Sequence, residues 1–243
     1  MRVALHVGIE ASSQVARGDG VTSEPNVLIL GIGNLLWADE GFGVRAVEAM
    51  HRLYRLPDCV RLVDGGTQGI YLVQLVRDAD VLIVFDAVDY GLPPGTLKRV
   101  EGDEVPQFLG VRKVSLHQTG FQEVLAMAEM LGDRPRHLLL IGVQPVELED
   151  YGGSLRPEVK AQIAPALHLA LAYLAGFGVH AEPRQGPVAP IGSPETAMDR
   201  YEAQRPAAQD AFRAGDDRVL GGGGWRGPTD FDAEMAQLVA RSH

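Results

Sequence analysis

VLILGIGNLLWADEGFGV, residues 27–44, combines an apolar run, a glycine-rich turn and the first residue of a helical pattern. The run VLILGIG is continuous, as expected of a parallel β-strand that is covered on both faces. Val44, Val47, Met50 and Leu53 then recur at helical spacing. A strand that turns through glycines directly into a helix is typical of the first unit of a doubly wound α/β sheet.

Further strand and helix patterns alternate along the chain. The predicted strands lie at residues 59–66, 81–87, 96–102 and 137–144. The predicted helices lie at residues 70–78, around 121–128 and from 157 to about 176. The alternating pattern at 96–102 suits an edge or antiparallel strand, and Pro165 should kink or split the last helix. The sequence therefore predicts the α/β fold class with a mostly parallel sheet.

The regular patterns divide the chain into three parts. Residues 1–25 are irregular and are expected to form a disordered N-terminal extension. Residues 26–178 carry the alternating pattern and form the predicted α/β domain. Residues 179–243 are rich in glycine, proline and polar residues, which predicts a mobile C-terminal tail.

Composition limits the classes of partner. The chain has 243 residues, of which 46% are hydrophobic, and its formal net charge of −10 disfavours nucleic acid and anionic membrane surfaces as partners. No apolar run approaches the roughly 20 residues that span a bilayer, and the N-terminal residues do not form a signal peptide pattern. The single cysteine, Cys59, excludes an internal disulfide and is compatible with a reducing cytosol, so we expect a cytoplasmic protein.

Acidic residues follow the predicted strands where each strand ends. In an open α/β sheet, binding sites form outside the carboxyl ends of the strands. The candidate residues at this edge are Asn34, Asp39, Glu40, Asp64, Asp86, Asp89 and, at the start of a helix, His117. Several carboxylates and one imidazole on a common rim could hold a metal ion.

Each candidate also has a simpler interpretation. Asp39 or Glu40 could stabilise a helix N-terminus, and for Asp39 we favour that role. Asp64, which precedes two glycines, could be a turn residue, and His117 could lie at the surface. Asp86 needs a stronger reason, because it ends an apolar strand.

A dinucleotide site is the alternative use of the glycine-rich turn. Gly31 and Gly33 begin the usual fingerprint, and Asp64 could bind a ribose. Leu36, however, occupies the place of the third glycine, and the two acids of the turn would repel a pyrophosphate.

Several separated blocks resemble the hydrogenase maturation proteases, endopeptidases that remove a short C-terminal extension from the large subunit of [NiFe] hydrogenases. The blocks are GIGNLLWADEGFGVRAVE, DGGTQG, DAVDYGLPPGT, SLHQTGF and LEDYGGSL, which span roughly residues 26–178 in order. The sequences of these blocks are similar to those of the branch that serves uptake hydrogenases. The resemblance implies a five-stranded twisted sheet flanked by helices in three layers, and a peptidase with an aspartyl-protease-like classification.

The resemblance also implies the site. By motif, the nickel-contacting residues of the family correspond to Glu40, Asp86 and His117, and the Asp of the DGGT block, Asp64, is functionally implicated. We expect nickel to arrive with the substrate, the large-subunit precursor, rather than to be held tightly by the free enzyme. The metal could then act in catalysis, with Asp64 as a base or positioning group, or only as a recognition tag. A chaperone that escorts the subunit without cutting it is the remaining alternative, and we expect a monomer.

Overall fold

The computed structural model describes residues 24–106 and 116–204, and for residues 116–120 and 204 it describes the backbone only. The strands are β1 (Val27–Ile32), β2 (Tyr54–Arg55), β3 (Val60–Gly66), β4 (Val81–Ala87), β5 (Leu97–Glu101), β6 (His137–Val143) and β7 (Glu182–Pro183). The helices are α1 (Phe42–Leu53), α2 (Val73–Arg77), α4 (Leu116–Met130), α5 (Pro157–Lys160), α6 (Ile163–Ala175) and α7 (Met198–Gln204). Short 3-10 helices are η1 (Ala38–Gly41), η2 (Gly69–Leu72) and η3 (Gly102–Glu104).

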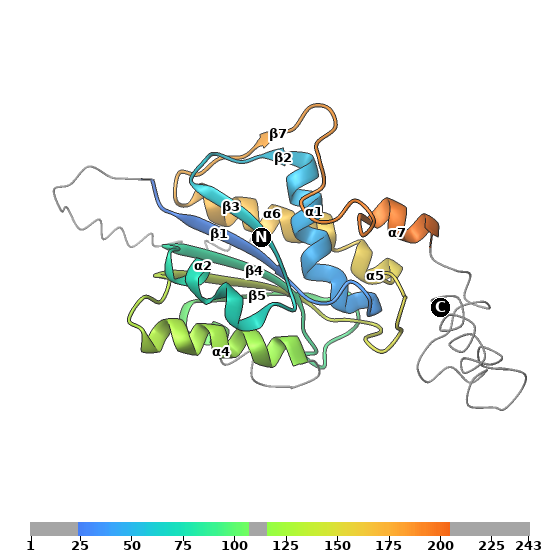
Figure 1. Ribbon diagram of the computed structural model, residues 1–243, viewed down its shortest axis with the longest axis horizontal. Helices are drawn as coiled ribbons and strands as arrows, with labels where there is room; N and C mark the ends of the chain where they lie inside the picture. The colour runs from blue at the N-terminus through green and yellow to red at the C-terminus, as the bar shows by residue number, and fades with distance from the viewer. Residues whose placement is uncertain (1–23, 107–115, 205–243) are drawn as a thin grey trace, which may run out of the picture.

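A five-stranded sheet in the order β3-β1-β4-β6-β5 forms the centre of the protein (Figure 1). The first four strands are parallel, and β5 pairs antiparallel with β6 at one edge. This arrangement confirms the predicted α/β fold class and the antiparallel edge strand. Gly31 of β1 lies opposite Asp64 of β3 on one side and opposite Phe85 of β4 on the other. The register therefore places Asp64 and Asp86 at the same end of the sheet.

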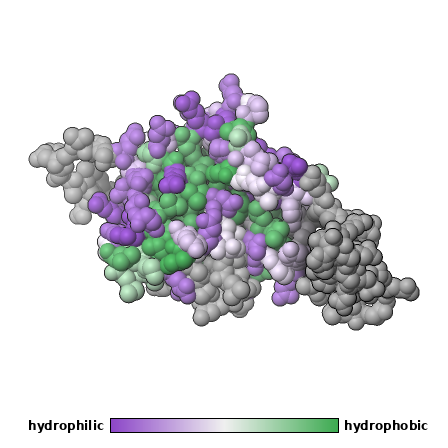
Figure 2. All heavy atoms as spheres, viewed as in Figure 1, coloured by the Kyte–Doolittle hydropathy of each residue, from purple (hydrophilic) through white to green (hydrophobic). Residues whose placement is uncertain are grey.

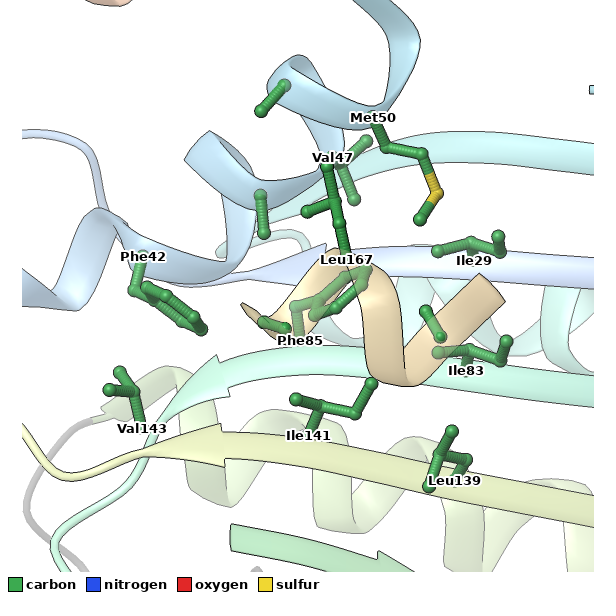
Figure 3. Packing of buried hydrophobic residues seen from close by; sticks show 14 of the residues in the cluster. Ile29, Phe42, Val47, Met50, Ile83, Phe85, Leu139, Ile141, Val143 and Leu167 are labelled. Carbon is green, nitrogen blue, oxygen red and sulfur yellow. The ribbon is translucent and has the colours of Figure 1, made fainter. Parts of the chain in front are cut away.

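Helices cover both faces of the sheet. On one face, Phe42, Val47 and Met50 of α1 and Leu167 of α6 pack against alternate residues of the central strands (Figure 3). On the other face, α2 and α4 pack against the intervening strand residues. Side chains of β1 and β4 are buried on both faces, which is why their sequences are continuous apolar runs. Each fully buried aliphatic or aromatic side chain contributes about 1.5–3 kcal/mol to folding.

The last predicted helix is split, as expected, but at residues 161–162 rather than at Pro165. Pro165 lies in the first turn of α6, where the missing N–H of proline has no intrahelical partner to lose. The helix predicted at 70–78 begins as the 3-10 turn η2 before α2. Among the described residues, no helix has both the length and the apolar character needed to cross a bilayer.

Part of the segment assigned to the tail contacts the domain. β7 pairs antiparallel with β2, and Ile191 and Met198 pack against the core beside α1 and α6. In Figure 1 this segment crosses α1 and ends in α7. The predicted division at residues 25 and 178 stays a prediction, but residues 179–204 make specific contacts that their composition does not indicate.

Candidate active site

Gly33 allows the chain to leave β1 and form η1 directly beside the strand end. Its φ is +133°, and a Cβ atom at this position would stand 1.8 Å from the carbonyl oxygen of Glu40. Only glycine can adopt this backbone conformation and leave room for that oxygen. The turn therefore fixes Glu40 at the carboxyl end of β1, within the element that also contacts β4.

Several backbone N–H groups of this turn are already used within the protein. Gly33 donates to the carbonyl of Gly66 at 3.0 Å, Asp39 to the carbonyl of Glu147 at 3.1 Å and Glu40 to that of Trp37 at 2.9 Å. A phosphate loop needs such groups to be open toward the ligand. The turn is therefore unsuited to the dinucleotide role that its first two glycines suggest.

Glu40 is a half-buried carboxyl that has lost much of its hydration. Desolvation by burial raises its pKa to about 7. A carboxylate in this setting is favourable when a cation replaces the missing water, because an opposite charge stabilises the ionised form. The position of Glu40 therefore fits a ligand for a cation presented at the rim.

Asp86 lies at the end of β4 and its exposed fraction is 0%. Its negative charge is felt by Tyr90, whose pKa is raised by burial and further by Asp86. The hydroxyl end of the Tyr90 ring lies close against Gly142 of β6, since a Cβ atom on Gly142 would come within 2.2 Å of the tyrosine Oη. This packing closes one side of the Asp86 environment and keeps it away from bulk water.

Asp64 lies near the end of β3, the strand at the other edge of the sheet from β5. Its carboxyl is half-buried, and burial raises its pKa, while the backbone N–H of Gly66 and the charge of Arg45 lower it. In Figure 2 apolar residues gather in the middle of this view of the molecule, with hydrophilic residues toward its margins. Because its carboxyl is half-buried, Asp64 combines an ionisable oxygen pair with partial access from solvent.

His117 is in the first turn of α4, and its side chain lies outside the described residues. Because α4 precedes the parallel strand β6, the helix must begin at the edge of the sheet where the strands end. The backbone thus places His117 at the same edge as Glu40, Asp64 and Asp86. Among the side chains that the structure describes, no three His, Cys, Asp or Glu residues form a group close enough to hold a metal ion. The full set of three nickel ligands stays a prediction.

The predicted capping role of Asp39 is wrong. Asp39 is fully buried, and η1 has no side-chain capping hydrogen bond. Its Oδ2 accepts the backbone N–H groups of Val146 at 2.8 Å and Glu147 at 2.9 Å, and its Oδ1 accepts that of Arg156 at 2.7 Å. Asp39 therefore binds the loop after β6, which contains the LEDYGGSL block, to the turn that carries Glu40. A carboxylate in a first helical turn looks the same in sequence whether it caps that turn or binds a distant loop.

A second contact holds the same loop beside the turn. Trp37 and Tyr151 pack edge to face with their ring centroids 5.2 Å apart, and the N–H of Gly152 donates to the carbonyl of Leu36 at 2.7 Å. Leu36 and Tyr151 remain exposed by 41% and 43%. These residues form an amphipathic surface next to Glu40. No sequence pattern predicted this surface.

Arg45 is a buried charged residue near the site that no sequence pattern indicated. It is only 3% exposed although it lies on α1, and its guanidinium contacts Glu48 and lowers the pKa of Asp64. The helical pattern alone would place this arginine on the solvent side. Its burial depends on residues 191–204, which lie far from it in the sequence.

Comparisons with known proteins agree with this fold. The family described as hydrogenase maturation protease matches residues 44–173. The hydrogenase expression/formation protein HupD of Thiocapsa roseopersicina is 65% identical over 201 residues, covering 82% of this chain and 91% of that protein. The hydrogenase 2 maturation protease of Escherichia coli (strain K12) is 44% identical over 160 residues, covering 65% of this chain and 96% of that protein.

A solved structure of a hydrogenase maturating endopeptidase has the same fold as this chain. The hydrogenase maturating endopeptidase HybD from E. coli superimposes with a TM-score of 0.63 at 42% identity, covering 65% of this chain and 98% of its own. The resemblance read from the separated sequence blocks is thereby confirmed. The chain belongs to the hydrogenase maturation protease family.

Proposed function

We propose that this protein removes the C-terminal extension from the nickel-loaded large-subunit precursor of a [NiFe] hydrogenase. The observation that carries the proposal is the placement of Glu40, Asp64 and Asp86 at the carboxyl end of one sheet in a chain of this peptidase family. The identity of 65% to the HupD protein supports an uptake-type hydrogenase as the source of the precursor.

Nickel enters this scheme as part of the substrate. Glu40 and Asp86 supply carboxylate oxygens and His117 supplies an imidazole nitrogen, donor types that suit a first-row divalent metal ion. The desolvated Glu40 and the buried Asp86 support this role, since both gain from a nearby positive charge. Docking of the precursor would then depend on the metal that it carries.

Asp64 is the candidate general base. In the hydrolysis, water adds to the scissile carbonyl carbon, its proton passes to the Asp64 carboxylate, and the C–N bond breaks as a proton is delivered to the leaving amine. The substrate nickel could polarise the carbonyl oxygen or act only as the recognition tag. In either case the scheme assigns the positioning of the attacking water to the Asp64 carboxylate, and the proposed aspartyl-protease-like classification follows from that assignment.

Cys59 does not fit the role of nucleophile. It precedes β3, whereas Asp64 lies near the end of that strand, about 16 Å away at the rise of an extended chain. Burial, followed by the charge of Glu24, raises the pKa of the Cys59 thiol. A cysteine nucleophile needs a lowered pKa, so its thiolate would be scarce at neutral pH.

Single substitutions test the assignment. Glu40→Gln, Asp86→Asn and His117→Ala should each reduce precursor processing strongly, while His168→Ala, an exposed residue on α6, should leave it unchanged. Gel or mass analysis of the incubated precursor measures the effect. Normal processing by all three variants would remove the assigned metal-binding role.

A further inference from the structure

Four large apolar side chains are exposed in the loops that follow the strands at the carboxyl end of the sheet. They are Leu36 after β1, Leu92 after β4, and Val146 and Tyr151 after β6, and their exposed fractions are 41%, 38%, 45% and 43%. Single apolar residues are common on protein surfaces, but several that lie together mark an interaction surface. We call these four residues the apolar strip.

The loops after β1 and β6 lie beside each other and are joined directly. The N–H of Gly152 donates to the carbonyl oxygen of Leu36 at 2.7 Å. Trp37 and Tyr151 form an isolated antiparallel β-bridge, and their ring centroids are 5.2 Å apart. Leu36 and Tyr151 therefore lie on neighbouring segments and form one end of the strip.

Two buried polar side chains hold the other members of the strip. Asp39, which is 0% exposed, accepts the N–H of Val146 at 2.8 Å. Gln144 is 6% exposed, and its Oε1 accepts the N–H groups of Tyr90 at 2.8 Å and Leu92 at 3.1 Å. Because Gln144 is two residues before Val146, these bonds connect the loop after β4 to the loop after β6. Hydrogen bonds thus hold the loops in place without a partner, which lowers the entropic cost of binding one.

The strip borders the half-buried carboxyl of Glu40. Asp39, which holds Val146, is the residue before Glu40, and the N–H of Glu40 donates to the carbonyl of Trp37 at 2.9 Å, next to Leu36. A cation that is carried by a protein reaches this carboxyl only when the protein surface around the cation also approaches the strip. The strip therefore fits a protein that presents a cation among apolar side chains, because the carboxylate matches the charge and the strip matches its surroundings.

We propose that the apolar strip is the docking surface for the large-subunit precursor and packs against the apolar side chains around its nickel. The proposal rests on the proposed function, in which Glu40 contacts that metal. Recognition then has two parts, because the carboxylates select the metal and the strip selects the protein that carries it. In this scheme the strip contacts neither the metal nor the scissile bond, so its residues determine the affinity for the precursor and leave the rate of bond cleavage unchanged.

Binding and processing of nickel-loaded precursor by the full-length protein test the proposal. The Kd is measured in an Asp64→Asn background, which prevents cleavage during the measurement, and KM and kcat are measured with Asp64 in place. The double variant Leu36→Ser/Val146→Ser should raise the Kd and the KM by about tenfold, since two apolar side chains lose their contact with the precursor. Its kcat should stay within about twofold of the wild-type value, because neither residue contacts the reacting atoms.

Two single variants complete the set. Leu92 lies in a different loop, which Gln144 holds, so Leu92→Ser tests the proposal even if the double variant does not fold. It should raise the Kd and the KM by about threefold. Met130→Ser is the matched control, because Met130 is 87% exposed but lies at the end of α4, away from the carboxyl end of the sheet. This control should change neither constant.

The outcomes separate this proposal from the proposed function. If the wild type cuts the precursor but the folded strip variants keep its Kd and KM, the docking role is overturned while the peptidase function stands. If the wild type binds the nickel-loaded precursor without cutting it, and the strip variants weaken this binding, the peptidase function fails and the docking role stands. Sedimentation of the protein alone tests a second copy of this chain as the occupant, and self-association that the strip variants abolish would overturn the proposal.

Discussion

Gly43 at the start of α1 lies against Phe85 of β4, so that a Cβ atom on Gly43 would be only 2.2 Å from the Phe85 carbonyl oxygen. The same atom would be 2.3 Å from the carbonyl oxygen of Ile32 in β1. The helix therefore rests on the backbone of the two central strands immediately before Asp86. This contact determines how closely the Glu40 turn approaches the end of β4.

Gly43→Ala should consequently destabilise the protein. Because backbone atoms of two strands surround the new methyl group, no flexible side chain can move aside, and we expect a loss of about 3 kcal/mol in the free energy of unfolding. Urea unfolding measures the change. Gly192→Ala is the matched control, because its Cβ would make an ordinary contact of 3.4 Å. Equal stability of the two variants would show that α1 does not depend on this close approach.

Asp39→Asn should loosen the loop that borders the site. An amide offers one acceptor oxygen, whereas Asp39 now accepts three backbone N–H groups with two oxygens, so at least one buried donor would lose its partner. We expect a loss of about 2–3 kcal/mol in unfolding free energy.

Hydrogen exchange provides the local measurement for Asp39. The amides of Val146, Glu147 and Arg156 should exchange faster in Asp39→Asn than in the wild type. Asp103→Asn serves as the control. Asp103 is 94% exposed, and within the part of the chain that the structure describes its one ion-pair partner is Arg134. Unchanged exchange at all three amides would contradict the role assigned to Asp39.

Glu40 should make the metal-free protein less stable as the pH rises. The pKa of Glu40 is raised from 4.5 to about 7 on folding, so the folded state binds the proton more tightly than the unfolded state does. Its stabilising contribution is complete below pH 4.5 and is lost as the pH rises through 7. After allowance for solvent screening of a half-exposed group, the effect is about 1 kcal/mol.

Glu40→Gln removes this titration. The variant should be more stable than the wild type at pH 8, by about 3 °C in Tm, and should match it near pH 4. Glu123→Gln, a substitution of an exposed residue on α4, should show no such pH-dependent gain. If Glu40→Gln were less stable than the wild type at pH 8, desolvation would not be the dominant influence on Glu40.

The sheet could be predicted from sequence because its signals are local. Strand β4 was predicted with the bounds that the structure shows, since a strand buried on both faces is apolar throughout. The alternating pattern of β5, after a turn rich in proline and glycine, likewise predicted its antiparallel position. The strands β2 and β7 could not be predicted, because each has two residues and forms only when distant parts of the chain meet.

The site was predictable to the extent that chain connectivity determines it. Glu40, Asp64 and Asp86 lie at the carboxyl ends of β1, β3 and β4 as the strand order requires. The contacts of Asp39 and Arg45 involve the loop 145–156 and residues 191–204, and no local pattern reveals such contacts. The monomeric state, the cytoplasmic location and the convergence of His117 on the two carboxylates stay predictions.

The central claim is that the protein cuts a precursor only when that precursor carries nickel. The most direct test incubates the full-length protein with large-subunit precursor from the same source, either nickel-loaded or nickel-free, and measures the intact mass of the products. We predict that the nickel-loaded precursor loses one C-terminal peptide while the nickel-free precursor keeps its mass. Efficient cleavage of the nickel-free form would contradict nickel-dependent recognition, and an uncut nickel-loaded precursor would indicate a binding protein rather than a peptidase.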